Sequence, residues 1–402
     1  MENTEIVVVG AGPAGLIVAS EVAKRGVDVK VVEEHPVIGE PNHCAGLLSV
    51  EGLRRLGVKP SEDFVQHEII GGRIYSPNGA DIEIRGNRTR AYAIDRAAFD
   101  RFLAEIAEGE GVEVETRRRV EDLMTKNGRV EGVLGRGWEI RAQVVVDAEG
   151  ATAALAMKAG LTSRKLGLLA GLNVEVSGVD IEPHKVEVWL GDDIAPGLFA
   201  WVIPLGDGVA RCGLACNSGD AHGRLMRFLD KRFNGAECSQ PRRGIVLTGG
   251  PARRTYWDGL LLVGDAAGQT KPTTGGGVIL GGLCAIEAGK TAAQAVEIDD
   301  CSARFLQRYQ KAWRASLGRE FASMSAARNL MNKLSDDRLN RLFDAFHREG
   351  LEETLNNLVE EGDMDMQSGV IRAALGKSTL HRVLVRVMGR MLLRELMSPF
   401  NL

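Results

Sequence analysis

The sequence predicts an α/β fold built around a parallel sheet, and three segments carry this expectation. The N-terminal stretch TEIVVVGAGPAGLIVASEVAKRGVDVKVVEE reads as a strand, a glycine-rich turn, a helix and a second strand. The segments AQVVVDAEG (142–150) and LLLVGD (260–265) are two further apolar strands, each followed by an acidic turn. Strands that alternate with helices favour parallel pairing, and ligands of such sheets bind beyond the carboxyl ends of the strands.

The first turn carries the spacing G-x-G-x-x-G at Gly10, Gly12 and Gly15. We expect Gly10 to make the tight turn, Gly12 to let the backbone approach a pyrophosphate, and Gly15 to let helix and strand pack closely. Ala14 stands at the start of the helix, whose free N–H groups face the phosphates. Glu33 ends the second strand, where an acid binds a ribose hydroxyl. The stretch predicts a dinucleotide site, for either NAD or FAD.

Composition narrows the class of protein. The 402 residues allow two domains, or one domain with an insertion, and the formal net charge of −4 gives no indication of nucleic-acid binding. We find no signal peptide and no apolar run of the ~18 residues that a membrane span needs. The six cysteines form no paired C-x-x-C framework, so we expect a cytoplasmic protein without a metal site. They are Cys44, Cys212, Cys216, Cys238, Cys284 and Cys301.

Later residues complete the expected cofactor site. Arg96 opens a helix that starts near Asp95, and from there it can reach a phosphate or the edge of a flavin ring. Asp265 ends a strand and can hold sugar-like hydroxyls. The sequence PTTGGGV then enters a long helix of small residues, whose first N–H groups make an electropositive patch. That patch, around Gly276, Gly277 and Val278, would stabilise the negative charge near N1 and O2 of a reduced flavin.

Together these pieces resemble the FAD proteins of the glutathione-reductase type, particularly the branch that holds p-hydroxybenzoate hydroxylase. The resemblance covers residues 1 to about 295. It rests on G-x-G-x-x-G, the D-R step at Asp95–Arg96, GDAAG at 264–268 and P-x-T-G-G-G at 272–277. It implies an FAD-binding Rossmann fold in which Asp265 contacts the flavin ribityl chain and the backbone of Val120 meets adenine.

The same resemblance implies a domain organisation. The FAD-binding domain is expected to be discontinuous, from residues 1–150 and 256–300, with part of 50–95 contributing to the substrate side. A β-sheet substrate domain is expected as an insertion at 151–255. Residues 301–402 read as a helical C-terminal region.

The loop GEPNHCAGLLS (39–49) looks like the P-x-x-C-A-G signature of the geranylgeranyl reductases, which include the archaeal digeranylgeranylglycerophospholipid reductases. The resemblance implies that this loop lies over the flavin, with Cys44, Ala45 and Leu47 in contact with it. Taken alone, Cys44 could be a nucleophile, half of a disulfide, a metal ligand or a small side chain beside a cofactor. A single cysteine in the loop argues against a redox disulfide. A catalytic role and a flavin-positioning role both stay open.

The strand LFAWVIP (198–204) is a second marker of that family, whose pattern is Y-x-W-x-F-P. Trp201 and Pro204 match it, whereas Phe199 replaces the tyrosine and Ile203 the phenylalanine. These departures keep an apolar wall but remove a hydroxyl group. We expect Phe199, Trp201 and Pro204 to line the substrate pocket.

The family resemblance implies FAD-dependent reduction of isolated C=C bonds in the geranylgeranyl chains of archaeal glycerophospholipid precursors. Alternatives on the same fold are a monooxygenase and a reductase of geranylgeranyl diphosphate or a chlorophyll precursor. A flavin-bearing electron carrier is the non-enzyme alternative. Because we see no second nicotinamide-binding fingerprint, a small reduced carrier such as ferredoxin is the expected electron donor.

The C-terminal stretch HRVLVRVMGRMLLREL carries arginine at every fourth position, namely Arg382, Arg386, Arg390 and Arg394. At helical spacing these arginines gather on one side, opposite most of the apolar residues. The pattern predicts a basic amphipathic helix at the inner face of an anionic membrane. It fits equally a helix with one core face and one solvated face.

Overall fold

The central strand of the first sheet is β1 (Glu2–Val9), whose last four residues are buried. In a computed structural model of the chain, which describes residues 2–162 and 167–400, β1 pairs in parallel with β2 (Val29–Val32) and β11 (Trp138–Asp147). The strand order is β18-β19-β11-β1-β2-β8, and β9 and β10 add an antiparallel hairpin beside β11. The other strands are β8 (Glu113–Glu115), β9 (Val120–Lys126), β10 (Arg129–Gly135), β18 (Tyr256–Trp257) and β19 (Leu260–Leu262).

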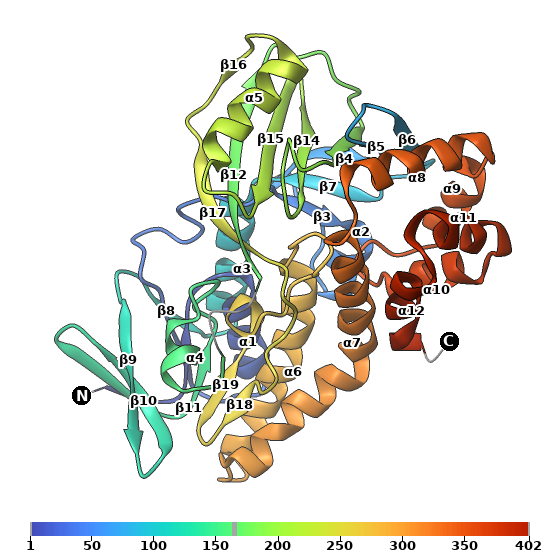
Figure 1. Cartoon of the computed structure of the whole chain (residues 1–402). Coiled ribbons are helices and arrows are strands. Elements are labelled where there is room, and N and C mark those ends of the chain that lie inside the picture. Colours follow the sequence, from blue (N-terminus) through green and yellow to red (C-terminus); the bar gives the residue numbers. More distant parts are fainter. Residues whose placement is uncertain (1, 163–166, 401–402) are drawn as a thin grey trace.

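Long helices cover one face of this sheet, and a hairpin with one short helix covers the other. Helix α1 (Pro13–Ala23) connects β1 to β2 and packs with α3 (Arg96–Gly109) and α6 (Val278–Glu297) in one apolar core (Figure 1). The opposite face is covered by the β9–β10 hairpin and α4 (Ala154–Lys158). The short 3-10 helix η1 (Gly264–Ala267) follows β19 and leads toward α6.

A second sheet stands above the first in Figure 1. Its order is β16-β12-β15-β14-β13-β5-β6, and β17 also pairs with β12. Helix α5 (Ala221–Phe233) covers one face of this sheet. The sheet therefore combines strands from residues 71–84 with strands from 168–247. Its members are β5 (Gly71–Tyr75), β6 (Asp81–Ile84), β12 (Leu168–Ser177), β13 (Lys185–Trp189), β14 (Phe199–Gly206), β15 (Val209–Cys216), β16 (Glu237–Cys238) and β17 (Arg242–Leu247).

A small third sheet lies between the two large ones. It has the order β3-β7-β4, with β3 (Leu47–Ser49), β4 (Val65–Ile69) and β7 (Ala91–Ile94), and α2 (Val50–Arg55) follows β3 directly. The Cys44 loop enters this sheet through β3. The free face of the second sheet packs against the same region, because Leu47 and Ala93 share an apolar cluster with Trp201.

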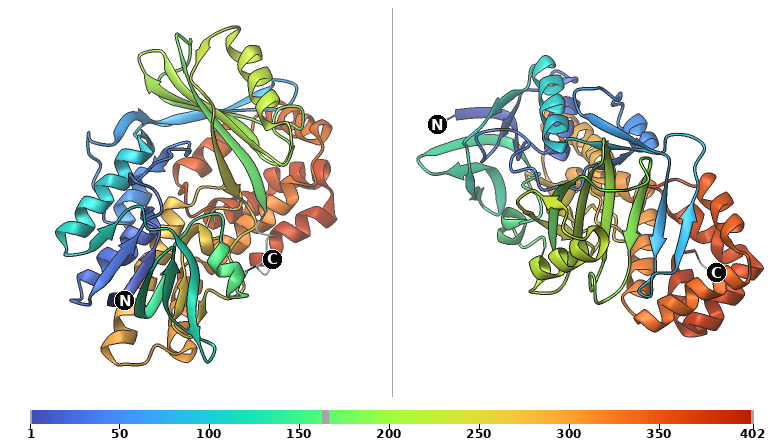
Figure 2. Two further views of the ribbon diagram at one scale, coloured as in Figure 1. Left: turned by 90° about the vertical axis from the view of Figure 1, so that its left-hand side faces the viewer. Right: turned by 90° about the horizontal axis from the view of Figure 1, so that it is seen from above.

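The C-terminal region is helical. Its first helix begins beside β18 and packs against α6, whereas the later helices lie at the end of the molecule opposite the β9–β10 hairpin (Figure 2). No helix in the described part of the chain is long and apolar enough to cross a membrane. These elements are α7 (Ala303–Met331), α8 (Asp336–Arg348), α9 (Glu352–Glu360), α10 (Ser368–Gly376), α11 (Ser378–Met388), α12 (Arg390–Met397) and η2 (Ser398–Phe400).

The expectation of one continuous amphipathic helix over 381–396 is wrong. The helix ends at Met388, and a new one begins at Arg390. Its apolar residues are buried inside the protein: Val383 is 0% exposed and Leu393 2% exposed. This leaves the alternative of a core face and a solvated face, with Arg382, Arg386 and Arg394 exposed. The side chain of Arg390 lies outside the described residues.

Candidate functional site

The glycine-rich turn is an open cradle at the N-terminus of α1. A Cβ placed on Gly10, whose φ is +99°, would lie 2.5 Å from the carbonyl oxygen of Ala148, so no side chain fits there. A Cβ on Gly12 would meet nothing within 4 Å, and no side chain caps the helix at this residue. Gly15 packs onto the Gly10 carbonyl. The turn therefore leaves free N–H groups facing empty space, which suits a pyrophosphate.

Glu33 lies beside this cradle. One of its carboxylate oxygens, Oε2, accepts the Ala11 N–H at 2.9 Å, and the other accepts the His35 N–H at 2.8 Å. The segment that leads to Val120 runs alongside, because the N–H of Arg118 donates to the Glu33 carbonyl at 2.8 Å. Glu33 and Val120 therefore lie at the same edge of the sheet, where the adenosine half of a dinucleotide is expected.

Asp265 lies on the other side of α1. Ala14 packs against Gly264, since a Cβ on Gly264 would lie 2.8 Å from the Cβ of Ala14. Burial raises the pKa of the Asp265 carboxyl, and the charges of Arg96 and His43 oppose that rise. These through-space interactions place Arg96 and His43 around the same buried region as Asp265.

The N-terminus of α6 closes this region. The helix begins at Val278, and no side chain caps its N-terminus at Gly277. A Cβ on Gly277 would lie 2.5 Å from Oδ1 of Asp265, and one on Gly276 would lie 2.8 Å from Cε of Lys271. The backbone N–H groups of α6 and the Asp265 carboxyl are therefore neighbours.

Cys44 is partly buried and lies beside Arg96. The Arg96 guanidinium binds Asp100, with Nε 2.7 Å from Oδ1, and it lies close enough to Cys44 to interact with it electrostatically. The Cys44 sulfur accepts the Gly46 N–H at 3.4 Å. Burial raises the pKa of Asp100 despite the attraction of Arg96. All six cysteines are free thiols in the structure, so Cys44 is not half of a disulfide.

The apolar wall of the site comes from both sides of the Cys44 loop. Ala45 and Leu47 belong to one cluster with Phe199 and Trp201, whose ring centroids are 6.1 Å apart in an edge-on arrangement. Pro204 is not part of this wall. It lies three residues after Trp201 and pairs with Ala210, so the strand alternation turns it to the opposite, α5-covered face.

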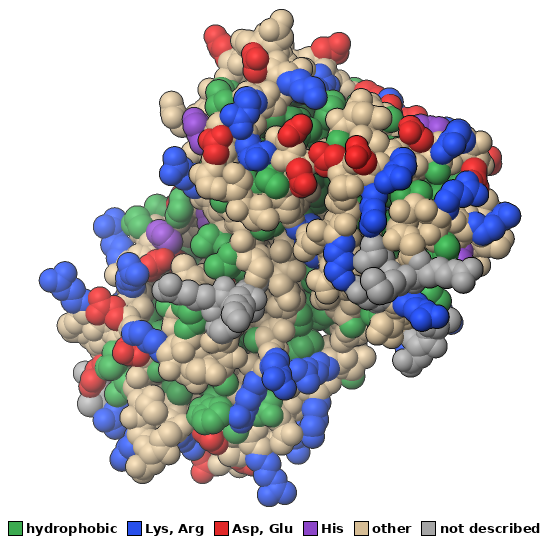
Figure 3. All heavy atoms as spheres, in the orientation of Figure 1, with side chains coloured by type: hydrophobic (Ala, Val, Ile, Leu, Met, Phe, Trp, Pro, Cys, Tyr) green, Lys and Arg blue, Asp and Glu red, His purple; other side chains and the backbone are tan. Residues whose placement is uncertain are grey.

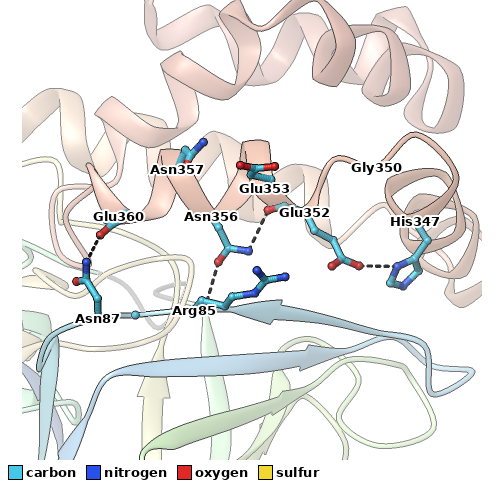
Figure 4. Close-up of a pocket in the computed structure, with 10 residues that line it drawn as sticks. Arg85, Asn87, His347, Gly350, Glu352, Glu353, Asn356, Asn357 and Glu360 are labelled. Carbon is cyan, nitrogen blue, oxygen red and sulfur yellow. Dashed lines mark hydrogen bonds and ion pairs between the residues drawn. The ribbon is translucent and has the colours of Figure 1, made fainter.

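A separate groove of about 620 Å³ lies between the end of β6 and helices α8 and α9 (Figure 4). Its walls are polar and paired: Nδ2 of Asn87 donates to Glu360 at 2.8 Å, and His347 binds Glu352 at 2.8 Å. Such a surface does not suit a hydrocarbon chain. It contains none of the residues expected from the sequence.

Two buried polar residues of the second sheet were missed in the sequence. Asn173 and Arg211 both contact the Cys44 loop, and they are 6% and 3% exposed. Each interrupts an apolar strand, LLAGLNVEVS or VARCGLAC. A polar side chain in a buried strand is itself a signal, because it must find a partner there.

Comparison with known proteins identifies the family to which this chain belongs. Digeranylgeranylglycerophospholipid reductase 2 of Methanopyrus kandleri is 34% identical over 364 residues, which are 86% of this chain and 91% of that protein. The chain belongs to the digeranylgeranylglycerophospholipid reductase family. Residues 5–355 also match the family model described as "Lycopene cyclase protein", so the chain belongs to that family as well. The two names describe different reactions. The sequence identity to individual proteins, 34% over 364 residues for the relative above, is to the reductases.

Solved structures agree with this family assignment. A "geranylgeranyl bacteriochlorophyll reductase-like" protein from Thermoplasma acidophilum superposes with a TM-score of 0.83 and 26% identity, covering 96% of this chain and all of that one. Halogenase PltM, solved with phloroglucinol and FAD, shares the fold alone: its TM-score is 0.68 at 13% identity, over 99% of this chain and 95% of that one. The reductase-family chain thus has the glutathione-reductase-type architecture expected from the sequence.

The residues of this site fit FAD. The open cradle at Gly12 suits the pyrophosphate, and the carboxylate of Glu33 suits the adenosine ribose. Asp265 suits the ribityl hydroxyls. The uncapped N-terminus of α6 suits a ring that becomes negatively charged.

Proposed function

We propose that this chain is an FAD-dependent reductase that saturates isolated C=C bonds in the geranylgeranyl chains of archaeal glycerophospholipid precursors, giving phytanyl chains. The observation that carries the proposal is the contact between the Cys44 loop, through Ala45 and Leu47, and the Phe199–Trp201 wall. The names of the relatives supply the substrate class.

In this proposal the cofactor-binding residues are those described above. Gly10, Gly12, Ala14 and Gly15 hold the pyrophosphate turn. The remaining contacts run from adenine to the flavin ring: Val120, Glu33, Arg96, Asp265, Gly276, Gly277, Val278, Cys44, Ala45 and Leu47. Reduced FAD supplies the hydride when it is bound.

The chain must then orient the alkene, exclude water and deliver a proton. An isolated alkene has no carbonyl group to polarise it, so hydride addition to one carbon needs a proton for the other. Phe199, Trp201, Ala45 and Leu47 form a dry wall for the prenyl chain. Cys44 stands directly before Ala45 of that wall and carries an exchangeable S–H proton, so we propose its thiol as the group that delivers the proton.

An anaerobic reduction tests the reaction. The purified yellow protein is reduced with dithionite, mixed with a geranylgeranylated glycerophospholipid and analysed by mass spectrometry. We expect the lipid to gain hydrogen in pairs, and the oxidised protein to leave it unchanged. Intact lipid beside fully reduced flavin would overturn the proposal, and oxygen consumption would then favour a monooxygenase.

Cys44→Ala tests the proton role separately. We expect this variant to bind FAD normally and to reduce lipid ~10²–10⁴-fold more slowly, the range typical of a lost general acid. Unchanged turnover would leave Cys44 with a positioning role only.

The electron donor is proposed to be a small reduced carrier such as ferredoxin, because only one dinucleotide fingerprint is found in the sequence. Flavin reduction is followed at its visible absorption band with NADPH or with reduced ferredoxin. Rapid reduction by NADPH alone would contradict this proposal.

Peripheral membrane contact is also proposed, because the substrate is a membrane lipid. Basic side chains spread over the C-terminal helices at the right of Figure 3, and Arg382, Arg386 and Arg394 are exposed. Since the apolar faces of α11 and α12 are buried, the attraction would be electrostatic. Flotation with anionic vesicles should lose binding at high salt, whereas salt-insensitive binding would contradict it.

A further inference from the structure

The backbone on either side of Cys44 is held by two side chains from the second sheet. Nδ2 of Asn173, on β12, donates to the carbonyl of His43 at 2.9 Å. Nη1 of Arg211, on the neighbouring strand β15, donates to the carbonyl of Ala45 at 3.2 Å. The residues before and after the cysteine are therefore both anchored to the sheet that carries the apolar wall.

The Arg211 guanidinium donates hydrogen bonds to four different residues. Besides Ala45, it donates to the Ile94 carbonyl at 2.9 Å, to Oε1 of Gln66 at 2.9 Å and to Oε1 of Glu175 at 3.0 Å. A guanidinium that is 3% exposed holds its place only when its donors are satisfied in this way. Its position is therefore well defined.

Gly46 makes room for this guanidinium. Its φ is +67°, and a Cβ on it would lie 2.5 Å from Nη1 of Arg211 and 2.5 Å from the Ile94 carbonyl oxygen. The Gly46 carbonyl in turn accepts the Ile94 N–H at 2.8 Å. The turn that follows Cys44 is thus shaped around Arg211.

Asn173 links the loop to the substrate wall. Its Oδ1 accepts the indole N–H of Trp201 at 3.0 Å, while its Nδ2 holds the His43 carbonyl. An amide can satisfy both groups only in one orientation, with Oδ1 toward Trp201. The indole N–H therefore sets the direction in which the Asn173 amide faces the loop.

The space behind the loop is too small for substrate. A cavity of about 10 Å³, lined by Cys44, Asn173, Arg211 and neighbours, has room for about one water molecule. Asn173 and Arg211 line this small cavity together with Cys44, so they reach the reaction through the residues they hold, namely the Cys44 loop and, for Asn173, Trp201.

We propose that Asn173 and Arg211 are positioning residues that clamp the Cys44 loop, and that Trp201 orients the Asn173 clamp through its indole N–H. The effect of this clamp on catalysis rests on the proposed reductase function. The clamp keeps the thiol next to Ala45, at the end of the apolar wall.

Thiol alkylation tests the clamp without lipid or turnover. A Cys238→Ser background removes the exposed thiol, and FAD-loaded protein is treated with iodoacetamide. Cys44 is followed by peptide mass spectrometry beside the buried Cys212, Cys216 and Cys284, which report global opening. The variants are Asn173→Leu, Arg211→Met, Arg211→Lys and Trp201→Phe. Arg232→Met is the matched control, because it breaks an ion pair to Glu187 on the α5-covered side of the same sheet.

We expect alkylation of Cys44 alone to quicken about five- to tenfold in Asn173→Leu and Trp201→Phe, the size of one lost hydrogen bond. Arg211→Met should quicken it more and Arg211→Lys less, while Arg232→Met leaves it unchanged. The double variant Asn173→Leu/Trp201→Phe should not exceed Asn173→Leu, because Trp201 acts through Asn173.

Two results would overturn the clamp: unchanged alkylation of Cys44, or equal quickening at all the thiols. Lipid reduction is then measured for Asn173→Leu and Arg211→Met, with a lower kcat and an unchanged KM expected. If the enzyme reduces lipid but the variants show no faster alkylation of Cys44, the clamp alone is refuted. A clear clamp signal in a protein that leaves lipid intact refutes the reductase proposal alone.

Discussion

At the scale of single residues, two glycines of the same turn have separable roles. Gly10 has a positive φ and no room for a Cβ, whereas Gly12 has an extended backbone and open space around it. We expect Gly10→Ala to destabilise the protein even without FAD, by more than ~1 kcal/mol, because the backbone of Ala148 must shift. Gly12→Val should leave the FAD-free protein as stable as wild type and weaken FAD binding. Denaturant unfolding and FAD titration of both variants measure this, and equal loss of stability in the two would contradict it.

A second prediction at this scale concerns a pair of carboxyls next to the turn. Asp147 is fully buried, and in the described structure its Oδ2 has no hydrogen-bond donor. Burial and the neighbouring Glu149 raise the pKa of Asp147 well above its usual range. A raised carboxyl pKa means that the folded state favours the proton, so stability falls as the pH rises above ~4.

Asp147→Asn should therefore stabilise the protein at pH 7, by about 1–3 kcal/mol, because an amide can donate to Glu149. The gain should shrink as the pH falls toward 4, because Asp147 becomes protonated in the folded state first and then increasingly in the unfolded chain. Unfolding curves at pH 4.5 and pH 7 test it. A gain that does not depend on pH would show that the carboxyl charge is not its cause.

At the scale of elements, the segment between α9 and α10 holds in place the loop that carries Lys271 and leads into α6. Asp365, with a side chain 2% exposed, pairs with Nζ of Lys271 at 2.7 Å and also binds the hydroxyl of Ser49, which caps α2. Asp365→Ala leaves Lys271 without its carboxylate, and we expect a loss of ~3–5 kcal/mol in the free energy of unfolding. Lys271→Met/Asp365→Leu should recover most of it. A denaturant midpoint that stays at the wild-type value in Asp365→Ala would contradict this role.

The elements also show what the sequence could and could not predict. The strand–turn–helix at the N-terminus and the start of α6 follow from local spacing, and the structure forms both. Contacts across sheets have no such local signal: Arg211 meets Ala45 across 166 residues of sequence. The side to which Pro204 turns follows from strand alternation, which a family motif does not express. The 381–396 segment looked like one helix because its arginine spacing continues across Gly389, where the chain turns.

At the scale of the whole molecule, the expected FAD site joins segments that are far apart in the chain. The turn at Gly12, the Arg96 helix, the Asp265 turn and the start of α6 are spread over residues 10–278 of the sequence. The Cys44 loop adds the second sheet through Asn173 and Arg211. A ligand that binds only when these segments are assembled must stabilise the folded chain.

We therefore expect each tenfold rise in free FAD above its dissociation constant to add about 1.4 kcal/mol to the free energy of unfolding. Denaturant unfolding over a series of FAD concentrations measures this slope. Gly12→Val should reach the same slope only at higher FAD, because the valine side chain occupies the cradle meant for the pyrophosphate. Riboflavin, which lacks the pyrophosphate and adenosine, should stabilise wild type far less. If riboflavin matched FAD, the turn at Gly12 and the carboxylate of Glu33 would contribute nothing to cofactor binding, and the adenosine half of the site would have to be placed elsewhere.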